Sequence, residues 1–349
     1  MLLRPTITLL HSLLLSIVQA LSSANANTSS SNNNINIMTM TTSSVALRSV
    51  KQILPAAPMY WVGDGFHVQQ VFSNKACTEE LSPFLMLDYA VPKYFKPNEN
   101  GSPLGIGQHP HRGVDTVMMA FKGEVEHADS IGNQDVIKPG DVQWMTSGRG
   151  IIHQEFHSNE FSKKGGELEI CQLWVNLPKK DKMTKPHYQP IVNKNIPVVD
   201  LKEASVDKEC SEETVGSVRV IAGSFLGTKG PASTFSPVEL WDTTIQKKGA
   251  VVDLPLPDDY NCIVFVRQGE IDIIGEGGDP KRVGAQGVAL LKREGGIIRI
   301  QSAQQNASLL VMGGLPLNEP IAHRGPFVMN TLDEIDQANR DYKMGKFGK

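Results

Sequence analysis

Residues 108–156 carry the strongest indication of both fold and site. They open with His109-Pro110-His111 and close with His153-Gln154-Glu155. Side chains alternate between the two faces of a β-strand, so each of these short runs places two polar groups on one face. If the two strands face each other inside a barrel, three imidazoles and one carboxylate converge on one point. Such a donor set, with room left for exogenous ligands, is typical of non-haem Fe(II) sites.

Outside this stretch, short apolar segments alternate with Gly, Pro and Asn turns. Examples are Thr116–Phe121, Asp141–Met145, Leu168–Val175, Ile263–Val266 and Ile271–Ile274. Many short strands with this punctuation, and almost no long helical period, predict an all-β barrel or sandwich. The exception is the tail 331–342, where Thr331-x-x-Glu334 has the form of a capping box and predicts a short C-terminal helix.

The second half of the chain repeats the pattern of the first. Phe265–Glu270 is similar to Met119–Glu124: in each, an apolar strand meets Gly-Glu and then another strand. Residues 284–291 take the place of 139–145. The second half contains no His-x-His sequence, so a second barrel would lack a comparable metal site.

Composition sets the broad class. The 349 residues are 40% hydrophobic and 20% charged, which is ordinary globular composition, and the net charge is −3. No basic tract stands out, so direct binding of nucleic acid is not expected. The four cysteines are Cys77, Cys171, Cys210 and Cys262; they form no CxxC pair, and free thiols are expected.

Residues 1–44 do not have the pattern of a folded domain. Arg4 precedes an apolar segment and then a zone rich in Ser, Thr and Asn, and no acidic residue occurs before Asp64. This order suits a secretory signal, followed by a segment similar to an organelle transit peptide. The apolar segment is too short for a stable membrane span. A start at Met38 or Met40 is the alternative, and it would leave the protein in the cytoplasm or nucleus.

Three motifs identify a resemblance to the pirin family of the cupin superfamily. They are His109-Pro-His-Arg-Gly113, the segment from Pro139 to His153 with its Gly148-Arg-Gly, and Pro316-Leu-Asn-Glu-Pro320 followed by Gly325-Pro-Phe-Val-Met-Asn330. The resemblance covers the chain from about Val45 to its end. It implies two cupin (double-stranded β-helix) barrels, expected over 45–190 and 191–349, with iron in the first barrel only.

The resemblance also implies a ligand set and a function. The family's iron ligands fall on His109, His111, His153 and Glu155; zinc, manganese, copper or nickel on the same ligands stay open. One implied function is a quercetin 2,3-dioxygenase that opens a flavonol ring with dioxygen, with Glu155 as general base. The alternative is a redox-sensing, iron-dependent co-regulator that binds a transcription factor without turnover. A cupin isomerase or sugar-processing enzyme is a third possibility. A monomer is expected.

Several other residues near the motifs have expected positions in the fold. Asp115 stands where cupins usually carry Glu, and it is expected to hold a ligating histidine from outside the metal's own shell. Trp144 and Met145 are expected to line the barrel, the Trp144 ring as a core residue and not as a platform for substrate, and His157 is expected at the surface or rim. Arg149 is expected at the surface, and His67 and His127 are expected to be structural.

Overall fold

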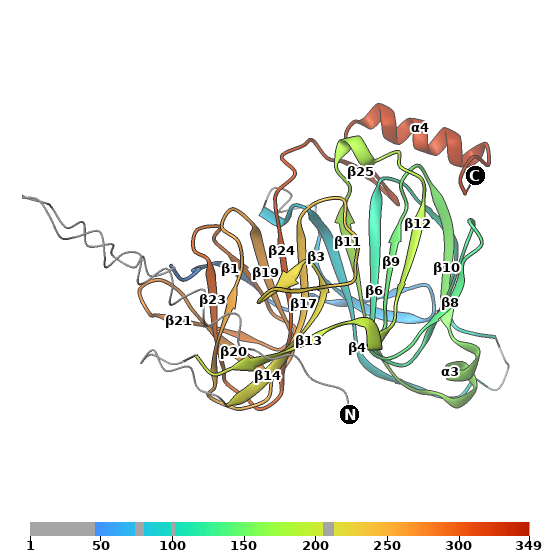
Figure 1. The fold of residues 1–349 in the computed structure, drawn as a ribbon. Helices are drawn as coiled ribbons and strands as arrows, with labels where there is room; N and C mark the ends of the chain where they lie inside the picture. The colour runs from blue at the N-terminus through green and yellow to red at the C-terminus, as the bar shows by residue number, and fades with distance from the viewer. Residues whose placement is uncertain (1–45, 74–79, 99–101, 205–212, 349) are drawn as a thin grey trace, which may run out of the picture. The chain divides into compact units, whose positions relative to one another are not determined.

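The computed structural model describes residues 46–73, 80–98, 102–204 and 213–348, and the expectations for residues 1–44 lie outside these ranges. Within them the chain forms two barrels, each built from a seven-stranded and a four-stranded antiparallel sheet. The predicted all-β fold with two cupin barrels is confirmed (Figure 1).

The two barrels have the same strand arrangement. The large sheet of the first has the order β12 (His187–Ile191), β9 (Val142–Thr146), β6 (Val114–Lys122), β11 (Gly166–Asn176), β4 (Phe84–Phe95), β3 (Phe66–Ser73), β2 (Met59–Val62). Its small sheet has the order β5 (Gly105–His111), β10 (Ile151–His157), β7 (Val125–Asp129), β8 (Gln134–Ile137). In the second barrel the large sheet runs β1 (Val50–Leu54), β22 (Val288–Leu291), β19 (Asn261–Gln268), β24 (Ala307–Gly314), β17 (Val238–Ile245), β14 (Thr214–Ala222), β13 (Val198–Lys202). Its small sheet runs β18 (Val251–Pro255), β23 (Ile297–Ser302), β20 (Glu270–Ile274), β21 (Pro280–Gly284).

Outside the barrels lie α3 (Asn159–Lys164), the two-stranded pair β15 (Ser224–Phe225) and β16 (Thr228–Lys229), and the short 3-10 turns Lys179–Asp181 and Asn193–Asn195. After the second barrel the chain forms β25 (Ala322–Arg324), β26 (Phe327–Met329) and α4 (Leu332–Lys343).

The central strands of the large sheets are buried on both faces, which explains their nearly continuous apolar sequences. In β6, Met118 and Ala120 belong to the core inside the first barrel. Val117 and Met119 point the other way, into a core shared with β19 and β24 of the second barrel. The two large sheets therefore pack face to face, and side chains two apart share one of the two cores.

The sequence repeat corresponds to a structural repeat at the turns that follow β6 in the first barrel and β19 in the second. The Ala120 carbonyl accepts from Gly140 N at 2.7 Å, and the Val266 carbonyl accepts from Gln286 N at 2.7 Å. Gly123 and Gly269, which follow the two strands, have φ angles of +74° and +83°. Only glycine adopts this backbone region readily, so the paired Gly-Glu sequences have a structural cause.

Each end of the described chain packs against the barrel on the other side of the expected boundary at residue 190. Strand β1 joins the second barrel, at the sheet edge that β12 occupies in the first. Conversely, the segment after β24 returns to the first barrel, where Val328 N donates to the Arg112 carbonyl at 3.0 Å. Helix α4 is held there by the buried ion pair of Arg112 and Asp341, at 2.9 Å. The C-terminal segment therefore packs against the first barrel, although it follows the second barrel in sequence.

The predicted C-terminal helix and its capping box are confirmed. Thr331 Oγ1 accepts from Glu334 N at 3.2 Å, and Glu334 Oε2 accepts from Thr331 N at 2.9 Å. The box pairs two backbone N–H groups that the first turn would otherwise leave without partners.

The substitution Thr331→Ala should lower the free energy of unfolding by about 1 kcal/mol, because the side-chain acceptor for Glu334 N is lost. Urea denaturation of wild type and variant measures the difference. Thr331→Ser keeps the hydroxyl and should lose much less. Equal losses for the two substitutions would show that the capping oxygen is not the cause.

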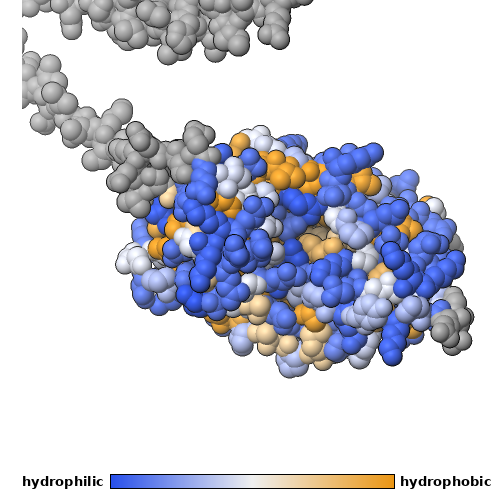
Figure 2. All heavy atoms as spheres, turned by 90° about the horizontal axis from the view of Figure 1, so that it is seen from below, coloured by the Kyte–Doolittle hydropathy of each residue, from blue (hydrophilic) through white to orange (hydrophobic). Residues whose placement is uncertain are grey.

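Apolar side chains gather mainly inside the barrels and between them. Figure 2 shows a face that is mostly hydrophilic, with smaller groups of hydrophobic residues between the polar ones. Cys171 and Cys262 are buried free thiols, as expected, and Cys77 and Cys210 lie outside the described residues. In the described part of the chain, no helix is both long and apolar enough to cross a membrane.

Candidate metal centre

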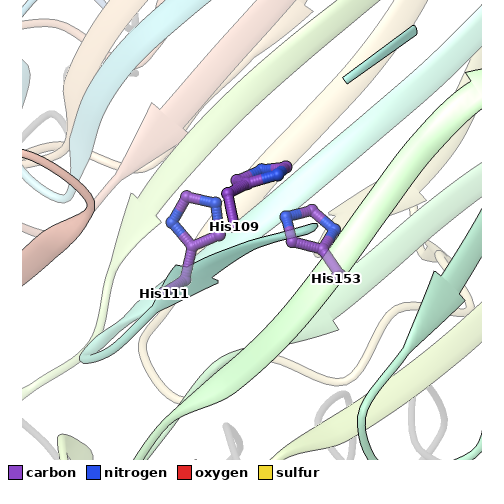
Figure 3. Close-up of side chains that lie close together, drawn as sticks. All are labelled: His109, His111 and His153. Atoms are coloured by element: carbon purple, nitrogen blue, oxygen red, sulfur yellow. The ribbon is translucent and has the colours of Figure 1, made fainter. Parts of the chain in front are cut away.

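Two neighbouring strands of the first barrel's small sheet carry the predicted histidines. Strands β5 and β10 are antiparallel, and His109 stands directly opposite His153. His111 follows two positions along β5 and so extends toward the same face. Figure 3 shows the three imidazoles turned toward one another from these strands. Their ring centroids are 4.2 Å apart for His109 and His153, 5.1 Å for His109 and His111, and 5.0 Å for His111 and His153.

The hydrogen bonds of these rings leave nitrogen atoms free toward the centre of the cluster. His109 Nδ1 donates to the Gly107 carbonyl at 2.9 Å, and His111 Nδ1 donates to the Pro326 carbonyl at 3.3 Å. A carbonyl only accepts, so each ring donates through Nδ1, and Nε2 is the nitrogen that can present a lone pair to a cation. His153 is buried, and neither of its ring nitrogens has a hydrogen-bond partner.

Burial keeps two of these imidazoles, His111 and His153, neutral. Burial and, to a smaller extent, the neighbouring His109 together lower the pKa of His111 to about 3. Burial also lowers the pKa of His153 well below its usual value, again assisted by the adjacent histidines. Neutral imidazoles can donate lone pairs to a cation, which protonated rings cannot.

Glu155, the fourth predicted ligand, lies beside the histidine cluster rather than in it. The three histidines place one nitrogen each within 4.8 Å of one another; a second group of the same kind consists of His127, His153 and Glu155. His153 Nδ1 and Glu155 Oε1 are 4.0 Å apart. Burial raises the pKa of Glu155, while His109, His127 and a hydrogen bond from Gln172 lower it. His153 is thus shared by two possible donor sets.

His127 is the residue near the site that sequence reasoning missed. It lies on β7, directly opposite Glu155 on β10. Its Nε2 donates to Asp129 Oδ2 at 3.2 Å, and its ring stacks on Tyr188 at 4.9 Å. These contacts agree with the expectation that His127 is structural. That expectation did not include its position beside Glu155. The pairing of β7 with β10 was the missing information, because His127 has no histidine near it in sequence.

Several other expectations were wrong. Asp115 accepts a hydrogen bond from Trp144 Nε1 at 2.9 Å and does not hold a ligating histidine. It lies two residues before Val117, on the face of β6 that packs between the barrels, so it cannot reach the site. Trp144 is a core residue, as expected, but it belongs to that shared core between the barrels and does not line the first barrel. Burial raises the pKa of Asp115 to about 7, partly offset by its hydrogen-bond donors.

His157 is a core residue and not a rim residue. It is 2% exposed, its Nε2 donates to the Gly65 carbonyl at 2.9 Å, and it packs edge to face on Phe95 and Phe161. Arg149 is exposed, as expected.

The donor set fits a divalent cation. His153 has two buried, unpaired nitrogens, and buried polar atoms in folded proteins normally have partners. Imidazole and carboxylate suit iron, zinc, manganese, copper and nickel, and no cysteine stands in either group. A bound cation would supply the missing partner of His153.

The second barrel has aliphatic side chains at the corresponding positions. Where Glu155 faces His127 in the first barrel, Ile300 faces Ile273 in the second. Leu254 stands opposite Ile298 on the strands that correspond to β5 and β10, and all four side chains are buried in that barrel's core. This arrangement explains why the described part of the second barrel shows no group of metal-ligating side chains.

A cavity of about 310 Å³ opens onto His109, His111 and Glu155. Its walls are mainly apolar and include Val62, Phe66, Met86, Ile106, Met118 and Trp174. Gly325 and Pro326 of the returning C-terminal segment complete the lining. An apolar cavity with a few converging polar groups is the usual form of a small-molecule site.

The fold and the site together define a two-barrel cupin with a candidate metal centre in its first barrel. The chain belongs to the pirin family: residues 65–175 match the pirin family model, and residues 240–348 match that of the pirin C-terminal cupin domain.

Relatives in several kingdoms support the assignment. A Pseudomonas aeruginosa protein, provisionally named a quercetin 2,3-dioxygenase, is 44% identical over 301 residues, which are 86% of this chain and 99% of the relative. A pirin-like protein of Solanum lycopersicum is 35% identical over 86% of this chain and 92% of its own length. The crystal structure of quercetin 2,3-dioxygenase from Acinetobacter baumannii has a TM-score of 0.79 and 43% identity, covering 87% of this chain and 99% of that one.

Proposed function

We propose that this pirin is an iron-dependent dioxygenase that opens the ring of a flavonol with dioxygen, in the manner of a quercetin 2,3-dioxygenase. The observation that carries the proposal is the unpaired, buried His153 beside His109 and His111 at an apolar cavity. The names of the Pseudomonas and Acinetobacter relatives give the substrate class. The balanced reaction converts the flavonol and one O₂ into the ring-opened ester and one carbon monoxide.

The proposed roles of the residues follow from their contacts. His109, His111 and His153 would hold the metal through neutral nitrogens, with Glu155 as the fourth ligand. The Gly107 and Pro326 carbonyls orient two of the rings by accepting from their Nδ1 atoms. When bound, Fe(II) would act as a Lewis acid and template for the substrate's hydroxyl and for dioxygen.

Glu155 is also the proposed general base, taking the proton of the substrate hydroxyl. It lines the cavity, and Gln172 Nε2 donates to its Oε1 at 3.3 Å, which fixes the carboxylate's orientation. Burial raises its pKa, whereas the charge of a bound cation would lower it, so the proposed base is the carboxylate after it has left the metal. The apolar walls would receive the flat aromatic rings and exclude water from the reacting carbon.

Metal analysis of the purified full chain, followed by oxygen uptake with quercetin, tests the proposal. We expect about one iron per chain and uptake that depends on both iron and quercetin. Iron without uptake would contradict the dioxygenase assignment and favour the alternative of a redox-sensing protein that binds a partner. Absence of any metal would contradict both.

Glu155→Gln should lower kcat by about 100-fold or more, the typical contribution of a positioned general base. The isosteric amide keeps the shape of the side chain but cannot accept the proton. Turnover and metal content are measured on the same preparation. Unchanged turnover with full metal loading would eliminate the base role, whereas turnover that falls only in proportion to metal content would leave Glu155 as a ligand alone.

A further inference from the structure

Two buried hydrogen-bond acceptors in the cavity have no partner. Asp88 on β4 and Gln172 on β11 are directly opposite each other in the sheet, and both line the cavity. Asp88 Oδ1 and Gln172 Oε1 are each buried and without a hydrogen bond. An unpaired buried polar atom is costly, so two of them side by side in a cavity indicate that a ligand supplies the donors.

The other polar atom of each side chain is fixed, which leaves the unpaired oxygen in a defined position. The Tyr60 hydroxyl donates to Asp88 Oδ2 at 2.7 Å. Gln172 donates through Nε2 to Glu155, so its Oε1 is the end of the amide that remains available. Asp88 is 7% exposed, and burial raises its pKa to about 6 against the lowering effect of the Tyr60 hydroxyl. The carboxyl is therefore mostly ionised at neutral pH and accepts strong hydrogen bonds.

We propose that Asp88 Oδ1 and Gln172 Oε1 form an acceptor pair that selects an aromatic substrate with two neighbouring hydroxyl groups. Directly opposite residues of antiparallel strands have Cβ atoms about 5 Å apart, so the two oxygens suit donors on adjacent carbons of one ring. The apolar walls favour a neutral aromatic donor over an ammonium group, whose desolvation is costly. This inference rests on the proposed function, because it assumes that the aromatic substrate occupies the same cavity.

Anaerobic binding to the metal-loaded full chain tests the acceptor pair without turnover. The two probes are a flavonol with adjacent hydroxyls on its pendant phenyl ring and the flavonol that lacks both. Hydrogen bonds to an ionised group contribute enough that wild type should bind the dihydroxy probe roughly 10-fold to 100-fold more tightly. In Asp88→Asn the preference should fall below about 3-fold, while the affinity for the flavonol that lacks the two phenyl hydroxyls stays the same.

Two further variants separate the acceptor from general effects. Tyr60→Phe removes the bond that holds Asp88 Oδ2 and should reduce the preference only in part. Asp253→Asn removes a carboxylate of the second barrel, paired with Arg299 at 2.7 Å, and should leave the preference unchanged. A folded Asp88→Asn protein with the full preference would overturn the inference. Equal affinity of wild type for the two probes, or no binding of either, would overturn it without any variant.

Oxygen uptake in air, measured separately, distinguishes this inference from the proposed function. A hydroxyl preference that depends on Asp88 but is accompanied by no uptake would leave the acceptor pair standing and reject the dioxygenase. Oxygen uptake without any preference for the dihydroxy probe would support the dioxygenase and reject the acceptor pair.

Discussion

His153→Ala should remove the metal and, with it, the quercetin-dependent uptake of oxygen. His153 belongs to both groups of possible ligands, and its two ring nitrogens are buried without partners. Its loss therefore leaves neither group complete. Removing a group that only hydrogen-bonds to a metal ligand typically lowers metal affinity by about 10-fold to 100-fold. We therefore expect the loss of a ligand itself to weaken metal binding by more than about 100-fold. Metal titration of the apoprotein and metal content after gel filtration give the two readouts.

The control for this substitution is His187→Ala, which removes an exposed imidazole of β12. It should keep the metal, the uptake and the wild-type stability. Metal should also raise the melting temperature of wild type and of His187→Ala but not of His153→Ala, because only a folded site binds it. A His153→Ala protein that retains one tightly bound metal per chain would show that the cluster is not the metal centre.

The centre of the site was predictable because it depends on a period of two within single strands. His109 and His111, and His153 and Glu155, share faces for that reason. The pairing register between strands was not predictable. The register of β10 with β5 shifts between His153 and Glu155, and the pairing of β10 with β7 places His127 opposite Glu155. Family analogy also misplaced Asp115, whose face follows from the register of β6.

Asp88 was overlooked for a different reason. It lies in Phe84–Tyr89, an apolar run typical of a buried strand, where a single carboxylate attracts little notice. A lone acid in such a run is itself a signal, since a buried carboxylate needs a partner. Likewise the crossing of the chain ends depends on pairings that are remote in sequence, such as β1 with β22.

The repeat that the sequence revealed also explains how the two barrels meet. Phe121 and Arg267 occupy equivalent positions in Met119–Glu124 and Phe265–Glu270, and the Arg267 guanidinium carbon lies 3.6 Å from the centre of the Phe121 ring. Equivalent strands of the repeat thus contact each other across the core between the large sheets. Arg267 also pairs with Glu169 of the first barrel at 2.6 Å and with Asp242 of the second at 3.3 Å.

Arg267→Met should lower the free energy of unfolding by about 3–5 kcal/mol, because it leaves buried carboxylates with fewer partners. Glu169 would keep hydrogen bonds from Tyr89 and Gln268, and Asp242 would keep its ion pair with Arg219. These remaining contacts do not replace the charge of Arg267 in a buried setting. Urea denaturation measures the loss, and circular dichroism checks that the variant starts folded.

The matched control is Arg282→Met, which makes the same substitution at an arginine that also pairs with two carboxylates, Glu270 and Asp272. Arg282 is 55% exposed, against 8% for Arg267. Exposed ion pairs contribute about 0–1 kcal/mol, so this variant should be nearly as stable as wild type. Adding Glu169→Gln to Arg267→Met should recover part of the loss, since it removes one of the uncompensated charges. Equal losses at the two arginines would show that burial between the barrels does not set the strength of this pair.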